Sequence, residues 1–149
     1  MKNQIPKASE SLLQQYRSNK VQALFMKDSS DLFDASKSLF NFSTLEWEPQ
    51  LVVLFLTTSN RLLGIVSGHK KLFLQAGSDS TSIYRYALSL NAHHVAIVSN
   101  FPTKHIISEN DKLTVVREFQ IAMKKLGVDL IDVVEVTEEV KPYSIFNKL

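Results

Sequence analysis

The sequence contains no cysteine, and this absence removes several kinds of chemistry. Without a thiol the chain can have no disulfide framework, no thiolate metal site and no cysteine nucleophile. A transition metal would therefore need histidine and carboxylate ligands. With only four histidines in the chain, the positions that can bind such a metal are few.

Long apolar runs and a strong excess of one charge are also missing. The longest apolar run, LVVLFL at residues 51–56, is far shorter than the roughly 20 residues of a membrane-spanning helix. No secretory signal is visible at the N-terminus, so we expect a cytoplasmic protein without a membrane partner. Seventeen Lys and Arg against fifteen Asp and Glu give a net charge of +2, which does not indicate nucleic-acid binding.

Glycine and proline are scarce as well, with four of each, and no stretch has the composition of a flexible linker. No internal repeat is present. A chain of 149 residues fits one domain with a single core. We therefore expect one domain, in which a helical N-terminal segment over residues 1–45 packs on the main part over residues 46–149.

Apolar spacing predicts two short helices near the N-terminus. Residues 8–18, ASESLLQQYRS, offer Ser9 as an N-cap and place two leucines and a tyrosine at helical spacing. Residues 28–41, DSSDLFDASKSLFN, show similar spacing behind a cluster of capping residues. KVQALFM, residues 20–26, is interpreted as a short strand between the two helices.

The middle of the chain predicts strands. Residues 50–68, QLVVLFLTTSNRLLGIVSG, are two β-rich apolar runs joined by a polar turn, which indicates a hairpin whose first strand is buried on both faces. KKLFLQAG, residues 70–77, predicts a third strand. HVAIVS, residues 94–99, predicts a buried strand that follows a helix over residues 79–92.

The strongest helical pattern covers residues 108–127, where positively charged residues precede a final glycine, Gly127, expected at the C′ position. A last strand follows over residues 128–136, and YSIF is expected to pack the C-terminus against the domain. These elements predict a mixed α/β (α+β) layer fold with a central sheet flanked by helices. The long helix should bury one stripe formed by Leu113, Val116, Phe119, Met123 and Leu126.

Several short segments, in this order, resemble the RadC family, the bacterial branch of the JAB/MPN (JAMM) metalloprotease-like fold. The resemblance implies a cytidine-deaminase-like layer fold with a central mixed sheet, and a RadC-like JAB/MPN domain over residues 46–149. It is greatest to short members that lack the helix-hairpin-helix DNA-binding region. The matching segments are NQIP, VLFLTTSNRLLG, ALSLNAHHVAIVSNFP, SENDKLT, LGVDLID and YSIF.

The resemblance also implies where a zinc site would lie. In that family two histidines of a His-Asn-His-Pro-Ser-Gly loop and a following aspartate hold zinc, leaving one coordination position open for water. Here Ser99 and Phe101 stand at the histidine positions, and only Asp111 keeps its ligand type. The rest of the motif is represented by Asn100, Pro102, Thr103 and Ser108.

The family's general base is a glutamate before the first hairpin strand, and its position falls near Pro49 or Gln50 here. Glu48 is one or two residues away, so Glu48 and Ser99 are the catalytic candidates. An Asp-His pair on the last strand of the family corresponds to Asp132 followed by valine.

The altered motif predicts a pseudoenzyme without a cofactor. One carboxylate cannot hold catalytic zinc, and a phenylalanine fills ligand space with apolar bulk. Asp111 also has a structural role available, because Ser108 and Asp111 match a capping box at the start of the long helix. We therefore expect a binding or assembly module with a protein partner or a second copy, and a DNA-repair context by resemblance alone.

One alternative remains open: a metal-dependent hydrolase or peptidase with a rebuilt zinc site. Its ligands would come from His105 and Asp111, with Ser99 and Glu48 nearby. His105 is more typical of an exposed loop histidine, since one short loop would have to replace two ligands. Ser99 lacks the Gly-x-Ser-x-Gly turn that exposes many serine nucleophiles.

Overall fold

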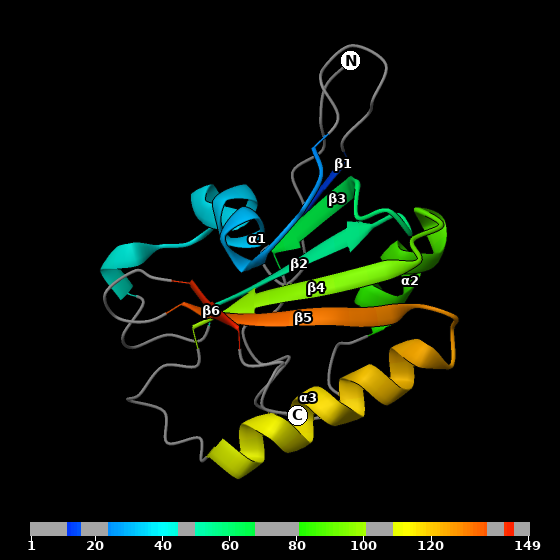
Figure 1. The fold of residues 1–149 in the computed structure, drawn as a ribbon. Helices are drawn as coiled ribbons and strands as arrows, with labels where there is room; N and C mark the ends of the chain where they lie inside the picture. The colour runs from blue at the N-terminus through cyan, green and yellow to red at the C-terminus, as the bar shows by residue number, and fades with distance from the viewer. Residues whose placement is uncertain are drawn as a thin grey trace.

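A computed structural model of the chain describes residues 12–15, 24–44, 50–67, 81–100, 109–136 and 142–144. Within these ranges six strands form one sheet in the order β1-β3-β2-β4-β5-β6 (Figure 1). The strands are β1 (Leu12–Gln15), β2 (Leu51–Leu56), β3 (Leu62–Ser67), β4 (His94–Ser99), β5 (Asp129–Val136) and β6 (Pro142–Ser144). The helices are α1 (Ser29–Ser36), α2 (Thr81–Ser89) and α3 (Glu109–Lys124), with 3-10 turns η1 (Lys37–Leu39) and η2 (Phe42–Thr44).

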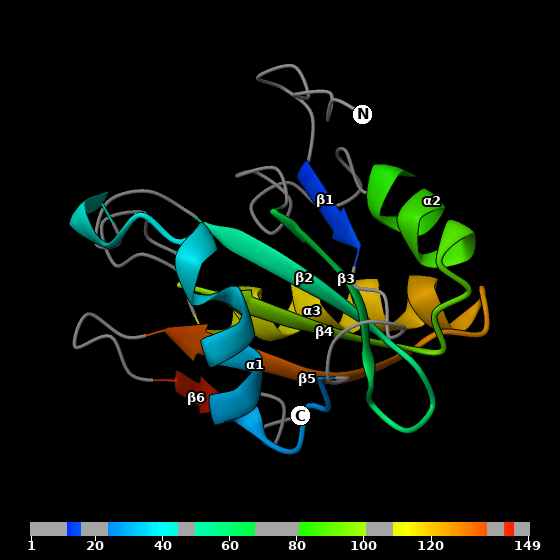
Figure 2. The same cartoon turned by 90° about the horizontal axis from the view of Figure 1, so that it is seen from above.

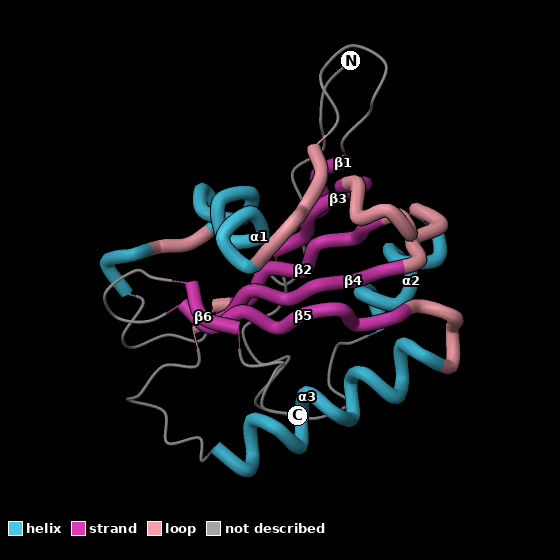
Figure 3. The backbone as a smooth tube through the Cα atoms, viewed as in Figure 1, coloured by secondary structure: helices cyan, strands magenta, loops and turns pink. Residues whose placement is uncertain are grey.

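The sheet is mixed, as the sequence predicts. β4 and β5 run parallel, and α3 lies between them in the chain, as the crossover of a parallel pair requires. The other neighbouring strands are antiparallel. Figure 3 shows the strands side by side with helices around them. The predicted mixed sheet flanked by helices is confirmed.

Helices cover both faces of this sheet, with α1 on one face and α3 on the other (Figure 2). Because successive side chains of a strand point to opposite faces, β2 supplies both cores. Val53 and Phe55 face α2 and α3, whereas Val52 and Leu54 face α1. All six residues of β2 are buried, which confirms the prediction for LVVLFL.

Both helices on the α3 side end in a Schellman motif. At α3, Gly127 has φ +77°, its N–H donates to the carbonyl of Lys124 at 2.9 Å, and Val128 N–H donates to Met123 O at 3.1 Å. The predicted C′ role of Gly127 is confirmed. Leu126 was expected on the buried stripe, but it lies beyond the helix and is 37% exposed.

The same arrangement ends α2, with asparagine in place of glycine. Asn91 has φ +54°, its N–H donates to Leu88 O at 3.1 Å, and Ala92 N–H donates to Ala87 O at 3.0 Å. Ala87 and Ala92 are both buried in the core that α2 shares with α3. The predicted helix over residues 79–92 is thereby confirmed as α2.

The N-terminal helix predicted for residues 8–18 is wrong, because Leu12–Gln15 form strand β1. β1 pairs antiparallel with β3 and satisfies backbone groups on the edge of the hairpin. This tertiary pairing outweighs a weak helical pattern in a short polar segment. The segment before residue 46 therefore supplies an edge strand as well as the predicted helix α1.

The interpretation of residues 20–26 as a strand is only partly met. Phe25 forms an isolated antiparallel bridge with Arg61, and Met26 N–H donates to Asn60 O at 2.9 Å. Residues 20–23 lie outside the described ranges, as do the predicted strand 70–77 and the last two residues of YSIF. Its first two residues belong to β6.

Candidate functional site

The candidate site lies where the end of β4 meets the start of β2. Ser99 is the last residue of β4 and pairs with Leu51, the first residue of β2. Gln50 directly precedes β2, so the strand pairing brings position 50 beside Ser99 and Asn100. The position that the resemblance assigns to a histidine ligand therefore lies beside Gln50, one of the two positions near which the resemblance places the general base.

Ser99 and Asn100 are both buried and both bind the backbone of Gln50. Ser99 is 3% exposed, and its hydroxyl donates to the Gln50 carbonyl at 3.0 Å. Asn100 is 5% exposed, and its side-chain Oδ1 accepts from Gln50 N–H at 2.9 Å. Its own N–H donates to the Gln50 carbonyl at 3.4 Å. These contacts fix the backbone at position 50 to the end of β4.

The Gln50 side chain turns toward the segment before β2. Its Oε1 accepts from Asn41 N–H at 2.7 Å, and its Nε2 donates to Asn41 O at 2.9 Å and lies 3.3 Å from Thr44 Oγ1. The backbone N–H of Asn41 can only donate, which fixes the orientation of the Gln50 amide. The carboxamide thus ties the η1–η2 region to the sheet.

The polar groups at this site are neutral and already paired. A carboxamide cannot take up a proton as a carboxylate does, and the Ser99 hydroxyl gives its hydrogen to a backbone carbonyl. A serine nucleophile needs a base within hydrogen-bond reach of that hydroxyl. The described contacts of Ser99 supply a carbonyl instead of a base.

These groups also do not fit zinc. Structural and catalytic zinc sites use Cys, His and carboxylate ligands, whereas this end of β4 presents a hydroxyl and two amides. Over the residues that the structure describes, no group of three His, Cys, Asp or Glu could hold a metal. The described part of the site is therefore unsuited to the ion that the resemblance implies.

The remaining predicted site residues fall mostly outside the described ranges. Glu48 lies there, and so do the loop residues Phe101, Pro102, Thr103, His105 and Ser108. Asp111 lies in the first turn of α3, but its side chain is not among those described. The helix begins at Glu109, directly after the predicted N-cap position. The structure thus brings Ser99 and Asn100 together with Gln50.

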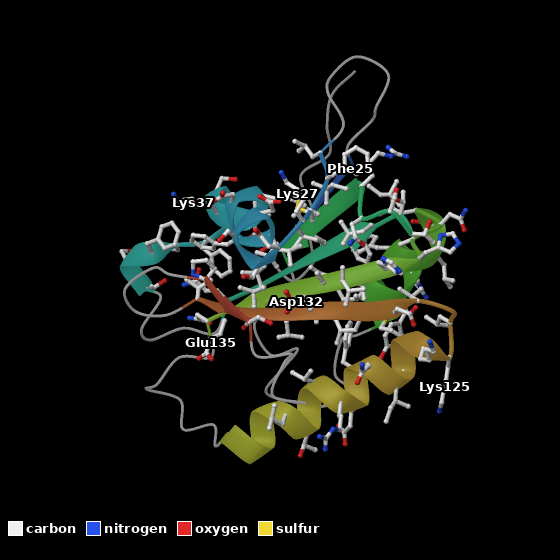
Figure 4. The ribbon with its side chains drawn as sticks, viewed as in Figure 1. Phe25, Lys27, Lys37, Lys125, Asp132 and Glu135 are labelled. Atoms are coloured by element: carbon white, nitrogen blue, oxygen red, sulfur yellow. The ribbon has the colours of Figure 1, made fainter. Side chains whose placement is uncertain are left out.

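Asp132 has a structural contact on β5. Its Oδ1 accepts from the Ser144 hydroxyl of β6 at 2.7 Å, while the neighbouring Val133 is fully buried in the core. Figure 4 labels Asp132 on the ribbon of β5. Asp132 and Val133, which the resemblance matches to the family's Asp-His pair, therefore form a strand-to-strand hydrogen bond and part of the core.

Sequence reasoning passed over Asn41 and the side chain of Gln50. No local pattern links two residues nine positions apart across an irregular segment. The one available signal is that Gln50 stands directly before the strand whose burial is evident from sequence. That position does not identify its partner.

A sequence profile described as the RadC-like JAB domain matches residues 26–148. Comparison with curated proteins gives no match. Within the described ranges no helix is long and apolar enough to cross a membrane. The profile covers most of the chain, and the mixed sheet with helices on both faces is consistent with its fold. The chain belongs to the RadC-like JAB domain family.

Proposed function

We propose that this RadC-like JAB domain is catalytically inactive toward zinc-dependent hydrolysis and acts as a binding or assembly module. The observation that carries the proposal is the hydrogen bonding of Gln50. Its N–H, its carbonyl and both ends of its carboxamide are all engaged with Asn41, Thr44, Ser99 and Asn100.

Hydrolysis by a JAB-type site would require a bound zinc and a group that takes a proton from its water. At the described end of β4 the Ser99 hydroxyl and the Asn100 amide bind backbone groups of Gln50. Gln50, one of the two positions near which the resemblance places the general base, holds neighbouring backbone here. This arrangement supports a domain retained for its surface, with a protein partner or a second copy.

The direct test is zinc content. We expect the purified, tag-free protein to retain much less than one zinc per chain after dialysis against zinc and then against buffer, as measured by elemental analysis. The same measurement on His105→Ala and Asp111→Ala should give the same low value as the unaltered chain. His93→Ala serves as the matched control, because His93 is an exposed histidine at the opposite end of β4.

The rebuilt hydrolase site gives the opposite result. It requires one zinc per chain that is lost in His105→Ala and Asp111→Ala and kept in His93→Ala. That pattern would overturn the proposal and direct work to hydrolysis. Zinc lost equally in all three variants would indicate adventitious surface binding and would leave the inactive assignment standing.

A further inference from the structure

A groove separates the last turns of α3 from the start of β5, at the opposite end of the sheet from Ser99. The parallel register pairs Asp129 with His94 at the beginning of β4 and Glu135 with Ser99 at its end. Figure 4 shows Lys125 and Glu135 at opposite ends of this region. The groove has a volume of about 760 Å³ and is lined by Gln120, Ile121, Lys124, Lys125, Asp129 and Leu130.

The groove combines an apolar wall with an excess of positive charge. Ile121 is 55% exposed, and Leu130, which is 3% exposed, lies across from it on β5. Lys125 follows Ile121 by four residues and Arg117 precedes it by four, so all three share one flank of the helix. Both charged residues are exposed.

The single acidic residue of the lining does not cancel this charge. Asp129 Oδ1 accepts from Lys124 Nζ at 2.7 Å, so this carboxylate is matched by one lysine. Arg117 is offset by Glu118, which is also exposed and precedes Ile121 by three residues, so Lys125 leaves the flank with one net positive charge. An occupant with carboxylates beside an apolar side chain would complement both properties of the groove.

The adjoining edge of β5 favours an extended occupant. β6 pairs only with Val134–Val136. Among the described strands none covers the outer edge of β5 from Asp129 to Val133. Backbone donors and acceptors at such an edge can pair with an added strand. Ile131 has no partner in the β4 register, and this bulge limits the regular edge to a few residues.

We propose that this groove binds a short extended segment of a partner protein in which carboxylates flank an apolar side chain. The apolar side chain lies against Ile121, above the buried Leu130. One carboxylate faces Lys125 in the groove, and the other lies beyond the lining, toward Arg117. The inference rests on the proposed function as a binding module and names the class of its partner. A second copy is disfavoured as occupant, because a two-fold contact centred here would bring the same cations together.

The test uses the full chain and a fluorescein-labelled synthetic hexapeptide, DELVDE, with KRLVKR as the charge-reversed control. We expect the fluorescence anisotropy of labelled DELVDE to rise to a plateau as protein is added. The anisotropy of labelled KRLVKR should not rise. Amide NMR shifts should change at Ile121, Lys125 and Leu130. Ile121→Asp and Lys125→Glu should each weaken binding about tenfold or more, a change of about 1.4 kcal/mol. Leu88→Asp is the matched control, because Leu88 is 58% exposed on α2 and does not line the groove.

Several results would overturn the inference. They are the absence of saturable binding at millimolar peptide, equal binding of KRLVKR, and equal weakening by Leu88→Asp. A dimer in sedimentation that Ile121→Asp dissociates would assign the groove to a second copy instead. None of these results depends on zinc, so a failure here is distinct from a failure of the inactive assignment.

Discussion

At the scale of single residues, Gln50 shows how one atom changes what a position can do. A carboxamide offers a donor and an acceptor, and both are needed here because the Asn41 backbone presents an N–H and a carbonyl. A carboxylate offers only acceptors when it is ionised. Replacing the carboxamide of Gln50 by a carboxylate would therefore test whether position 50 acts by hydrogen bonding or by proton transfer.

We expect Gln50→Glu to destabilise the fold at neutral pH, because the ionised carboxylate would face Asn41 O at a distance now spanned by a hydrogen bond of 2.9 Å. This contact favours the protonated acid and so raises the pKa of the introduced group above its unfolded value. The stability of the variant relative to the parent is then greatest at acidic pH. It falls as the pH rises through the raised pKa.

The measurement is denaturant unfolding of parent and variant at a series of pH values. Gln50→Ala is the companion variant, expected to lose about 1–2 kcal/mol at every pH, because it removes the side-chain hydrogen bonds without adding a charge. A Gln50→Glu variant as stable as the parent at neutral pH would show that the hydrogen bonds of the Gln50 amide to Asn41 do not stabilise the fold.

At the site, the sequence shows the residue types but does not predict which residues contact one another. The serine at position 99, where the resemblance implies a histidine, is visible in the sequence because it depends on residue type alone. The pairing of Gln50 with Asn41 depends on how an irregular segment crosses the end of the sheet. Two residues of ordinary polar type carry no mark of that contact before the chain is folded.

At the scale of elements, the ends of α2 and α3 are defined by two residues with positive φ. Gly127 adopts this conformation without a side chain, whereas Asn91 adopts it with one. A Cβ at Gly127 would meet no atom within 4 Å, so any cost of substitution comes from the backbone conformation and not from a clash.

We therefore expect Gly127→Ala to destabilise the protein by about 1–2 kcal/mol, the cost of a left-handed conformation for an L-residue. Asn91→Gly should act in the opposite direction and stabilise by a few tenths of a kcal/mol, because glycine removes that strain at α2. Thermal unfolding of both variants checks the pair. Equal stability of Gly127→Ala and the parent would show that the helix end relaxes.

Lys124 and Asp129 form an ion pair between the end of α3 and the start of β5. The hydrogen bond and the charge of Lys124 lower the pKa of Asp129 from its ordinary value of 3.8. Both side chains are well exposed, so the contribution to stability is about 0.5 kcal/mol or less. A lowered pKa means that this contribution is present above the unfolded value and is lost as the pH falls through the folded one.

Asp129→Asn should accordingly lower the melting temperature slightly at neutral pH and have no effect near pH 2. The comparison is thermal unfolding of the two proteins across that range. Repeating it at about 1 M salt should reduce the neutral-pH difference, because exposed ion pairs are screened. A difference that persists unchanged at low pH would assign the effect to something other than this ion pair.

Elements were predicted best where the pattern was long or uniform. α2 and α3 have apolar residues at helical spacing, and the hairpin, β4 and β5 are short β-rich apolar runs. β1 is short, and its leucines and glutamines are compatible with either period. Its conformation is decided by the edge of β3, which lies far along the chain.

At the scale of the whole molecule, the sheet is the partition between two cores. The run LVVLFL already implies that both faces of β2 are covered, because no residue in it is suited to solvent. Which helix covers which face is a tertiary result: Leu32 and Phe33 of α1 pack on one side, and Val116 and Phe119 of α3 on the other. The sequence predicts that both faces of the sheet are covered. Long-range packing determines which helix lies on each face.

The pairing of β1 with β3 has a consequence for the order in which a growing chain can fold. Leu12 finds its partner at Ser67, and Val52, which also pairs with Ser67, finds its second neighbour only at Val98. On the ribosome the first strand is therefore made long before the edge it joins. Until β3 emerges, the leucines of β1 have no strand to pair with. A nascent chain in that state exposes an unpaired strand, the kind of segment that chaperones protect from aggregation.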